Sequence, residues 1–195
     1  MSQVTDVIDH LVGIAPGSRL EAIRAQRPQA RDNAQASFRA LFEPAETEAM
    51  ALSERFAVAV FVAGLHGQGA IAEFYAAALE GDGAAILQAA EAAVTKGPYG
   101  HYPAGPLSVE DVPGPTWACA PALAAALGPR LAAAFAHAHL LVFHPRDAAP
   151  PALQALLDAG WTTTGIVTLS QLISFLSFQI RVVVGLRALA ANLAA

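Results

Sequence analysis

The sequence predicts an all-α protein, a helical bundle of paired helices within a single domain spanning residues 1–195. More than half of the residues (55%) are hydrophobic, and long stretches consist mainly of alanine and leucine, which lose little side-chain entropy in helices. No sizeable segment alternates apolar and polar residues as a half-buried strand does. Glycine and proline punctuate the apolar stretches, and the chain is long enough to bury a sizeable core.

Residues 1–46 are predicted to form an N-terminal helical extension. Residues 3–12 form a short amphipathic stretch, which the sequence "GIAPG" ends. Ser18 and Glu21 then have the spacing of a capping box, at the start of a helix that proline interrupts, and residues 31–42 form the next helix. We interpret the four arginines of this region as a solvated helix face. They are Arg19, Arg24, Arg27 and Arg31.

The middle of the chain predicts three helices and one long loop. Ser53 is suited to cap a helix that runs to about residue 65, and the glycines that follow mark a break before a returning helix. Residues 81–97 supply another helix. Residues 97–117 contain five prolines and four glycines and form the only long irregular segment, which in a compact helical domain is often functional.

The last third of the chain again predicts helices. Residues 118–143 are alanine- and leucine-rich, with a break near Gly128. A further helix has Pro150 or Pro151 in its first turn, where a missing amide costs nothing, and ends at a glycine. Residues 163–192 form one long helix or two successive helices, with Gly185 as the weakest point.

Composition excludes several classes of protein. A net charge of -5 and a pI near 5.6 argue against nucleic-acid binding, which requires a basic face. A single cysteine excludes an intramolecular disulfide framework and suits the reducing cytoplasm. The N-terminus has no basic segment typical of a signal peptide. Residues 159–180 are uncharged but rich in serine, threonine and glutamine, which favours a buried helix over a membrane span.

Two segments resemble a known superfamily. They are "LSERFAVAVFVAGLHGQGAIAEFYAAAL" (52–79) and "LQALLDAGWTTTGIVTLSQLISFLSFQIRVVVGLRAL" (153–189). The first is similar to the core helices of the carboxymuconolactone decarboxylase and alkylhydroperoxidase D superfamily, and the second to a block of its peroxidase-related branch. Together they cover about a third of the chain. The resemblance implies an all-α, alkylhydroperoxidase D-like fold that assembles into homo-oligomers, and it implies no cofactor.

The peroxidase motif of that superfamily is absent. Where the alkylhydroperoxidase branch has an acid followed by Cys-x-x-Cys-x-x-x-His, this chain has Phe56, Gln68, Ile71 and Tyr75. The dithiol mechanism needs a thiolate to attack the peroxide and a second thiol to resolve the sulfenic acid. None of the four residues can supply these functions, so the mechanism cannot be carried over to this helix.

Acid–base chemistry is the alternative that the decarboxylase branch implies, because its members also lack the cysteines. His66, Gln68 and Tyr75 are the candidate catalytic residues, since Gln68 and Tyr75 share a helix face and histidine titrates near neutral pH. The structural interpretation, which we favour, is that His66 caps a helix turn and Tyr75 packs in the core with its hydroxyl bonded.

A carboxylate substrate would also need binding residues. The candidates are Glu73, Trp161 and Arg181. Arg181 lies within a very apolar helix, where it acts either as a carboxylate clamp or, as we favour, in a salt bridge between helices or subunits.

Cys119 and the histidines offer further options. At a helix start, amide dipoles would lower the pKa of Cys119 and make it a peroxidatic thiol, whereas a buried free cysteine is ordinarily inert. His137 and His139 diverge on a helix, and His144 lies seven residues after His137. With Asp147 beyond a proline, we predict no metal site.

The sequence thus leaves three functions open. The first is a superfamily protein without the dithiol centre that binds or transforms a small organic acid between helices. The second is a non-catalytic partner subunit of a cysteine-bearing homologue, and the third is a one-cysteine hydroperoxide reductase that uses Cys119. A polar pocket around Tyr75 favours the first. A core filled by Phe56, Ile71 and Tyr75, with apolar surface uncovered, favours the second.

Overall fold

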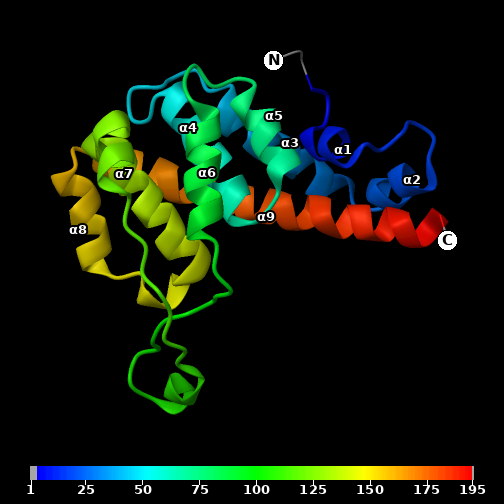
Figure 1. Cartoon of the computed structure of the whole chain (residues 1–195). Helices are drawn as coiled ribbons and strands as arrows, with labels where there is room; N and C mark the ends of the chain where they lie inside the picture. Colours follow the sequence, from blue (N-terminus) through cyan, green and yellow to red (C-terminus); the bar gives the residue numbers. More distant parts are fainter. Residues whose placement is uncertain (1–3, 195) are drawn as a thin grey trace.

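The computed structural model describes residues 4–194, and these residues are helical with no strand beyond a single bridge between Gly100 and Val112. The predicted all-α class is therefore confirmed. The helices are α1 (Val7–Val12), α2 (Arg19–Ala25), α3 (Pro28–Phe42), α4 (Leu52–Leu65), α5 (Gly69–Ala76), α6 (Gly83–Ala93), α7 (Pro121–Phe143), α8 (Pro150–Asp158) and α9 (Thr163–Ala194), with short 3₁₀ turns η1 (Pro106–Glu110) and η2 (Pro145–Asp147). Figure 1 shows their arrangement.

The N-terminal extension consists of α1, α2 and α3. Residue 3, where the sequence predicts the first helix to start, lies outside the described residues, and α1 begins at Val7. The predicted capping box is present in part. Ser18 Oγ accepts from the Glu21 amide at 3.2 Å, but the Glu21 carboxylate reaches the amide of Gly17 rather than that of Ser18.

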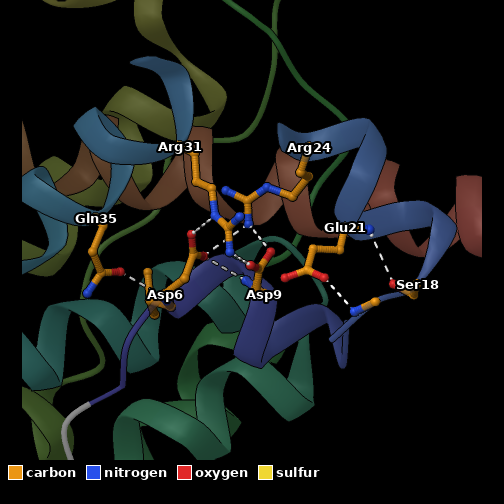
Figure 2. A network of polar contacts seen from close by, with 9 residues as sticks. Asp6, Asp9, Ser18, Glu21, Arg24, Arg31 and Gln35 are labelled. Carbon is orange, nitrogen blue, oxygen red and sulfur yellow. Dashed lines mark hydrogen bonds and ion pairs between the residues drawn. The ribbon is translucent and has the colours of Figure 1, made fainter. Parts of the chain in front are cut away.

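A network of four charged side chains joins α1 to α2 and α3 (Figure 2). Arg24 and Arg31 each contact both Asp6 and Asp9, and all four side chains are at least half buried. The Gln35 side chain accepts from the Val7 amide at 2.8 Å beside this network. The interpretation of the arginines as a solvated face is therefore wrong for Arg24 and Arg31, because these two side chains share two carboxylates and are largely removed from solvent.

Helix α4 is the centre of the bundle. It packs on α5, α6, α7 and α9, and it is buried from Arg55 to Leu65. Its start differs from the prediction, since Ser53 lies inside the first turn and the Glu54 carboxylate accepts from the Ala51 amide instead. Gly64 lets α6 approach closely, because a Cβ there would lie 2.5 Å from that of Ala90.

The buried Arg55 of α4 connects this core helix to α3. Its guanidinium donates to the carbonyls of Leu41 at 2.8 Å and Met50 at 3.1 Å. The bond to Leu41 satisfies a carbonyl at the C-terminal end of α3, which a helix leaves without a partner, and the bond to Met50 fixes the segment before α4. Burial lowers the pKa of Arg55, although Glu54 opposes the shift, and a guanidinium stays charged at any physiological pH.

The long loop folds back onto the end of α7. The Tyr99 amide donates to the Phe143 carbonyl at 2.6 Å, and η1 lies in the part of the loop farthest from the bundle (Figure 1). The predicted break in α7 is present as a kink at Gly128, which has a φ of 79°. Pro150 occupies the first turn of α8, as predicted, and Gly160 follows its end with a φ of 92°.

Helix α9 is continuous, and Gly185 does not interrupt it. It packs on α4, α7 and α8 in its first half, and on α1 and α3 of the N-terminal extension as well (Figure 1). Both α7 and α9 are long and apolar enough to cross a membrane by length and composition alone, a test that the core helices of soluble proteins also pass.

Candidate functional site

Three of the four positions that the resemblance aligns with the peroxidase motif lie in the hydrophobic core, and the fourth, Gln68, is half-buried. Phe56 and Ile71 are buried, and Tyr75 has no exposed surface. The Phe42 ring of α3 stacks on Tyr75 at 4.9 Å between centroids and lies 5.2 Å from the Phe56 ring. The space between α4 and α5 is therefore filled by side chains of the chain itself.

Tyr75 makes a buried hydrogen bond across the bundle. Its hydroxyl donates to Gln179 Oε1 of α9 at 2.5 Å, while Gln179 Nε2 has no partner in the described structure. Burial raises the pKa of Tyr75 well above its ordinary value, although the Gln179 bond opposes the shift, so the phenol is protonated at physiological pH. This geometry matches the structural interpretation, in which Tyr75 packs in the core with its hydroxyl bonded.

His66 and Gln68 lie in the turn between α4 and α5. His66 Nε2 is 3.3 Å from Ser177 Oγ of α9, and the Gln68 side chain contacts the His66 carbonyl at 3.5 Å. Burial, helped by the charge of Arg181, lowers the pKa of His66 to about 4. At pH 7 its imidazole is therefore neutral and weakly basic, which does not support the catalytic interpretation of His66.

These candidate catalytic residues do not converge on one point. His66 reaches α9 at Ser177, and Tyr75 reaches it at Gln179. Residues two apart on a helix point in directions about 200° apart, so the two contacts lie on different sides of α9. The structure brings His66 together with Gln68 but separates both from the Tyr75 hydroxyl.

The three candidate binding residues are also dispersed. Glu73 is exposed on α5, and Arg181 is exposed on α9 without a carboxylate within 4 Å among residues 4–194. Trp161 is buried between α8 and α9. Its Nε1 donates to the Arg130 carbonyl at 2.9 Å, and the Arg130 guanidinium lies 3.9 Å from the ring centroid. Trp161 therefore anchors α7, and about 30 Å of helix separates it from Arg181.

Cys119 is not placed as a peroxidatic thiol. It precedes the first residue of α7 by two positions and is partly buried. Burial raises its pKa, which keeps it in the less reactive thiol form. The helix-start geometry that would favour the peroxidase function is therefore absent at this residue.

We expect no hydroperoxide consumption above background from the purified protein, with or without Cys119→Ser. The physical reason is that the raised pKa leaves little thiolate to attack the peroxide. Consumption of cumene hydroperoxide in the presence of a dithiol reductant measures this. Turnover by the wild type that disappears in Cys119→Ser would contradict the expectation.

Two histidines of α7 and a third just after its end surround a cavity that the sequence did not indicate. His137, His139 and His144 are all buried, and together with Trp117 and Asp147 they line a cavity of about 270 Å³ between α7, α8 and the long loop. In the described part of the chain, no three His, Cys, Asp or Glu side chains lie close enough to hold a metal ion. The only sequence signal for this cavity was the proline and glycine content of the loop. That content predicts an irregular segment, but it does not predict where the segment packs.

Comparison with protein-family models, with curated proteins and with solved structures found no match to this chain. The likeness to the carboxymuconolactone decarboxylase and alkylhydroperoxidase D superfamily therefore rests on the two sequence blocks alone.

Proposed function

We propose that this chain is a non-catalytic subunit of the alkylhydroperoxidase D-like type, and that it works in the cytoplasm by assembling with other chains through α9. The observation that carries the proposal is the filled space between α4 and α5, where Tyr75 has no exposed surface. A substrate has no access to Phe56, Ile71 or Tyr75, three of the four positions that carry the chemistry in the superfamily that the sequence resembles. The candidate acid–base and binding residues also lie apart.

The exposed side of α9 supplies the surface for assembly. Its exposed residues recur at alternating spacings of four and three, which is the spacing of a helix–helix seam. They are Val167, Gln171, Ser174, Phe178, Arg181, Gly185 and Ala188, and we call them the α9 seam. Val167 and Phe178 are among the large hydrophobic residues that the protein leaves exposed.

A second copy of the chain is the occupant that best fits the α9 seam. Gly185, Ala188 and Ser174 are small, so two α9 helices can approach closely along the seam. The seam carries the positive Arg181 and no acid. A parallel pairing would place the two Arg181 side chains side by side, and their repulsion therefore favours an antiparallel pairing, which keeps them apart. A twofold contact of this kind uses the same surface on both subunits.

We expect Phe178→Glu to convert the assembled protein to monomers, because it places a charge at the centre of an apolar contact. The affinity of self-association should fall by about a hundredfold, as for the loss of an interface anchor. Light scattering coupled to size-exclusion chromatography measures the mass, and circular dichroism checks that the helices remain.

Val109→Glu is the matched control, since it places the same charge on the 90% exposed side chain of η1 and should leave the mass unchanged. A wild-type protein that stays monomeric when concentrated would contradict self-assembly. If it then pairs only with a cysteine-bearing homologue of the same fold, the subunit function stands with a different partner.

A further inference from the structure

A broad groove lies between the end of α3, the segment that follows it, α8 and the first half of α9. Its volume is about 1190 Å³. A space of this size accommodates an elongated molecule, because pockets for small ligands ordinarily measure about 300–1,000 Å³. The large apolar side chains that line the groove are Leu41, Leu153, Val167 and Phe175.

Arg55 is the only buried charged side chain among the residues that line this groove, and it is 4% exposed. Its Nε donates to the Met50 carbonyl at 3.1 Å, and its Nη1 donates to the Leu41 carbonyl at 2.8 Å and lies 3.5 Å from the Ala40 carbonyl. The third nitrogen, Nη2, carries two N–H donors and has no partner in the described structure.

The free Nη2 of Arg55 is accessible from the groove. In the described part of the chain, only His137 and Gln179 have a side-chain nitrogen that is both sealed from solvent and without a hydrogen bond. Arg55 Nη2 has no hydrogen bond and is not one of these sealed atoms, so it retains accessible surface. Because Arg55 lines the groove, Nη2 offers its two donors to a molecule bound there.

The charge of Arg55 has no carboxylate of its own. Within residues 4–194, no Asp or Glu oxygen lies within 4 Å of its guanidinium. Burial lowers the pKa of Arg55, and Glu54 opposes the shift, but the Glu54 carboxylate is already held by Arg130 at 2.6 Å and by the Ala51 amide at 2.9 Å. A buried charge without a partner is unfavourable, so an anion that pairs with Arg55 gains affinity.

The other charged side chains that line the groove decide the class of anion. Arg39, Glu43 and Glu46 are all exposed, so water screens their charges more than it screens the charge of Arg55. Arg39 adds a positive charge next to Ala40, whose carbonyl Arg55 contacts. The two glutamates repel a doubly charged phosphate more strongly than a singly charged carboxylate. The groove therefore suits a monocarboxylate with an apolar body.

We infer that the groove between α3, α8 and α9 binds a monocarboxylic acid with an elongated apolar body. The carboxylate accepts from Arg55 Nη2, and the apolar body packs on Leu153, Val167 and Phe175. This site goes beyond the proposed assembly and does not rest on it, because Arg55 and Leu153 lie outside the α9 seam.

Titration calorimetry with octanoate, octanamide and acetate tests the inference on the full chain. Octanoate should bind about tenfold to a hundredfold more tightly than octanamide, which is the contribution of a hydrogen bond between charged groups. Acetate lacks the apolar body and should bind at least about tenfold more weakly than octanoate. Octanamide or acetate that binds as tightly as octanoate would overturn the inference.

Leu153 and Leu157 are matched positions one turn apart on α8. They are 45% and 42% exposed, and of the two only Leu153 lines the groove. Leu153→Glu places a negative charge where the apolar body packs and should weaken octanoate binding by about tenfold or more. Leu157→Glu should bind octanoate as the wild type does. Equal effects of the two substitutions on octanoate binding would contradict the location of the site.

Arg55→Gln tests the pairing itself. It removes the positive charge, so the preference for octanoate over octanamide should disappear while both still bind. This ratio is not changed by a general loss of stability, and the comparison of Leu153→Glu with Leu157→Glu decides the matter if Arg55→Gln does not fold. A folded Arg55→Gln that keeps the full preference for octanoate would show that Arg55 does not bind the carboxylate.

The titrations are made on the wild type and on Phe178→Glu, because Val167, Gln171 and Ser174 belong to both the groove and the α9 seam whereas Phe178 does not line the groove. Octanoate binding to either protein supports the inference, and binding to neither overturns it. The masses of the two proteins report on assembly alone, so a failure of the proposed function is distinguished from a failure of this site.

Discussion

Replacement of Asp6 by alanine is expected to lower the free energy of unfolding by about 3 kcal/mol, since removing one partner of a buried ion pair leaves a charge uncompensated. Asp6 contacts Arg24 and Arg31, both at 3.0 Å, and the Asp6 side chain is only 9% exposed. Its loss also removes the N-cap of α1. For a chain of this size the melting temperature should fall by about 6–12 °C, which thermal unfolding followed by circular dichroism measures.

Asp32→Ala is the control for this prediction, because Asp32 is exposed on α3 and should change stability by at most about 0.5 kcal/mol. If Asp6→Ala and Asp32→Ala lowered the free energy of unfolding equally, the network of Asp6, Asp9, Arg24 and Arg31 would not stabilise the fold as described.

The same network predicts how stability depends on pH. Burial raises the pKa of Asp6, but the Asp9 amide and the two arginines outweigh it and hold the pKa below its ordinary value. The group then stabilises the folded state above the unfolded pKa of about 4, and this contribution is lost as the pH falls through the lower folded value. The stability difference between the wild type and Asp6→Asn should therefore shrink on acidification below about pH 4.

Gly64→Leu is expected to destabilise the protein by about 3 kcal/mol, at the upper end of overpacking effects. A Cβ at Gly64 would lie 2.5 Å from the Ala90 Cβ and 3.1 Å from Leu87 Cδ1. The Ala90 atom is fixed to the backbone of α6, so relief requires the whole helix to move away from α4. Urea unfolding measures the loss as a lower midpoint.

Gly69→Ala provides the comparison, since an added Cβ at Gly69 meets no atom within 4 Å. It should leave stability unchanged or raise it by up to about 1 kcal/mol, because alanine restricts the unfolded chain. If Gly64→Leu is tolerated as well as Gly69→Ala, then α4 and α6 do not pack as closely as described.

The order of helices was predictable because their ends are marked locally. Pro150, Gly128 and Gly160 act through backbone conformation, which depends on the residue itself. Gly185 shows the limit of such signals, since it is a poor helix residue whose cost is overcome by packing of α9 on α1 and α3. Ser53 was a reasonable cap, but the carboxylate of Glu54 reaches the free amide of Ala51 and moves the start of α4.

The site was less predictable because its contacts are distant in sequence. Arg31 meets Asp6 across 25 residues, so a helix pattern alone presents it as a solvated arginine. Tyr75 was predicted to pack in the core, but its hydrogen-bond partner Gln179 lies 104 residues away. No pattern in the sequence around Tyr75 indicates that partner. The three histidines were interpreted as ordinary core or surface residues rather than metal ligands, and nothing in the sequence shows that the loop returns to cover them.

Helix α9 also determines when α1 can complete its packing during synthesis. Arg187 of α9 donates to the Leu11 carbonyl of α1 at 2.6 Å, across 176 residues. Helix α1 therefore cannot close this contact until α9 has also been synthesised. Until then the apolar side of α4 that α9 covers lacks its partner helix. We therefore expect the growing chain to expose a hydrophobic surface of the kind that chaperones bind.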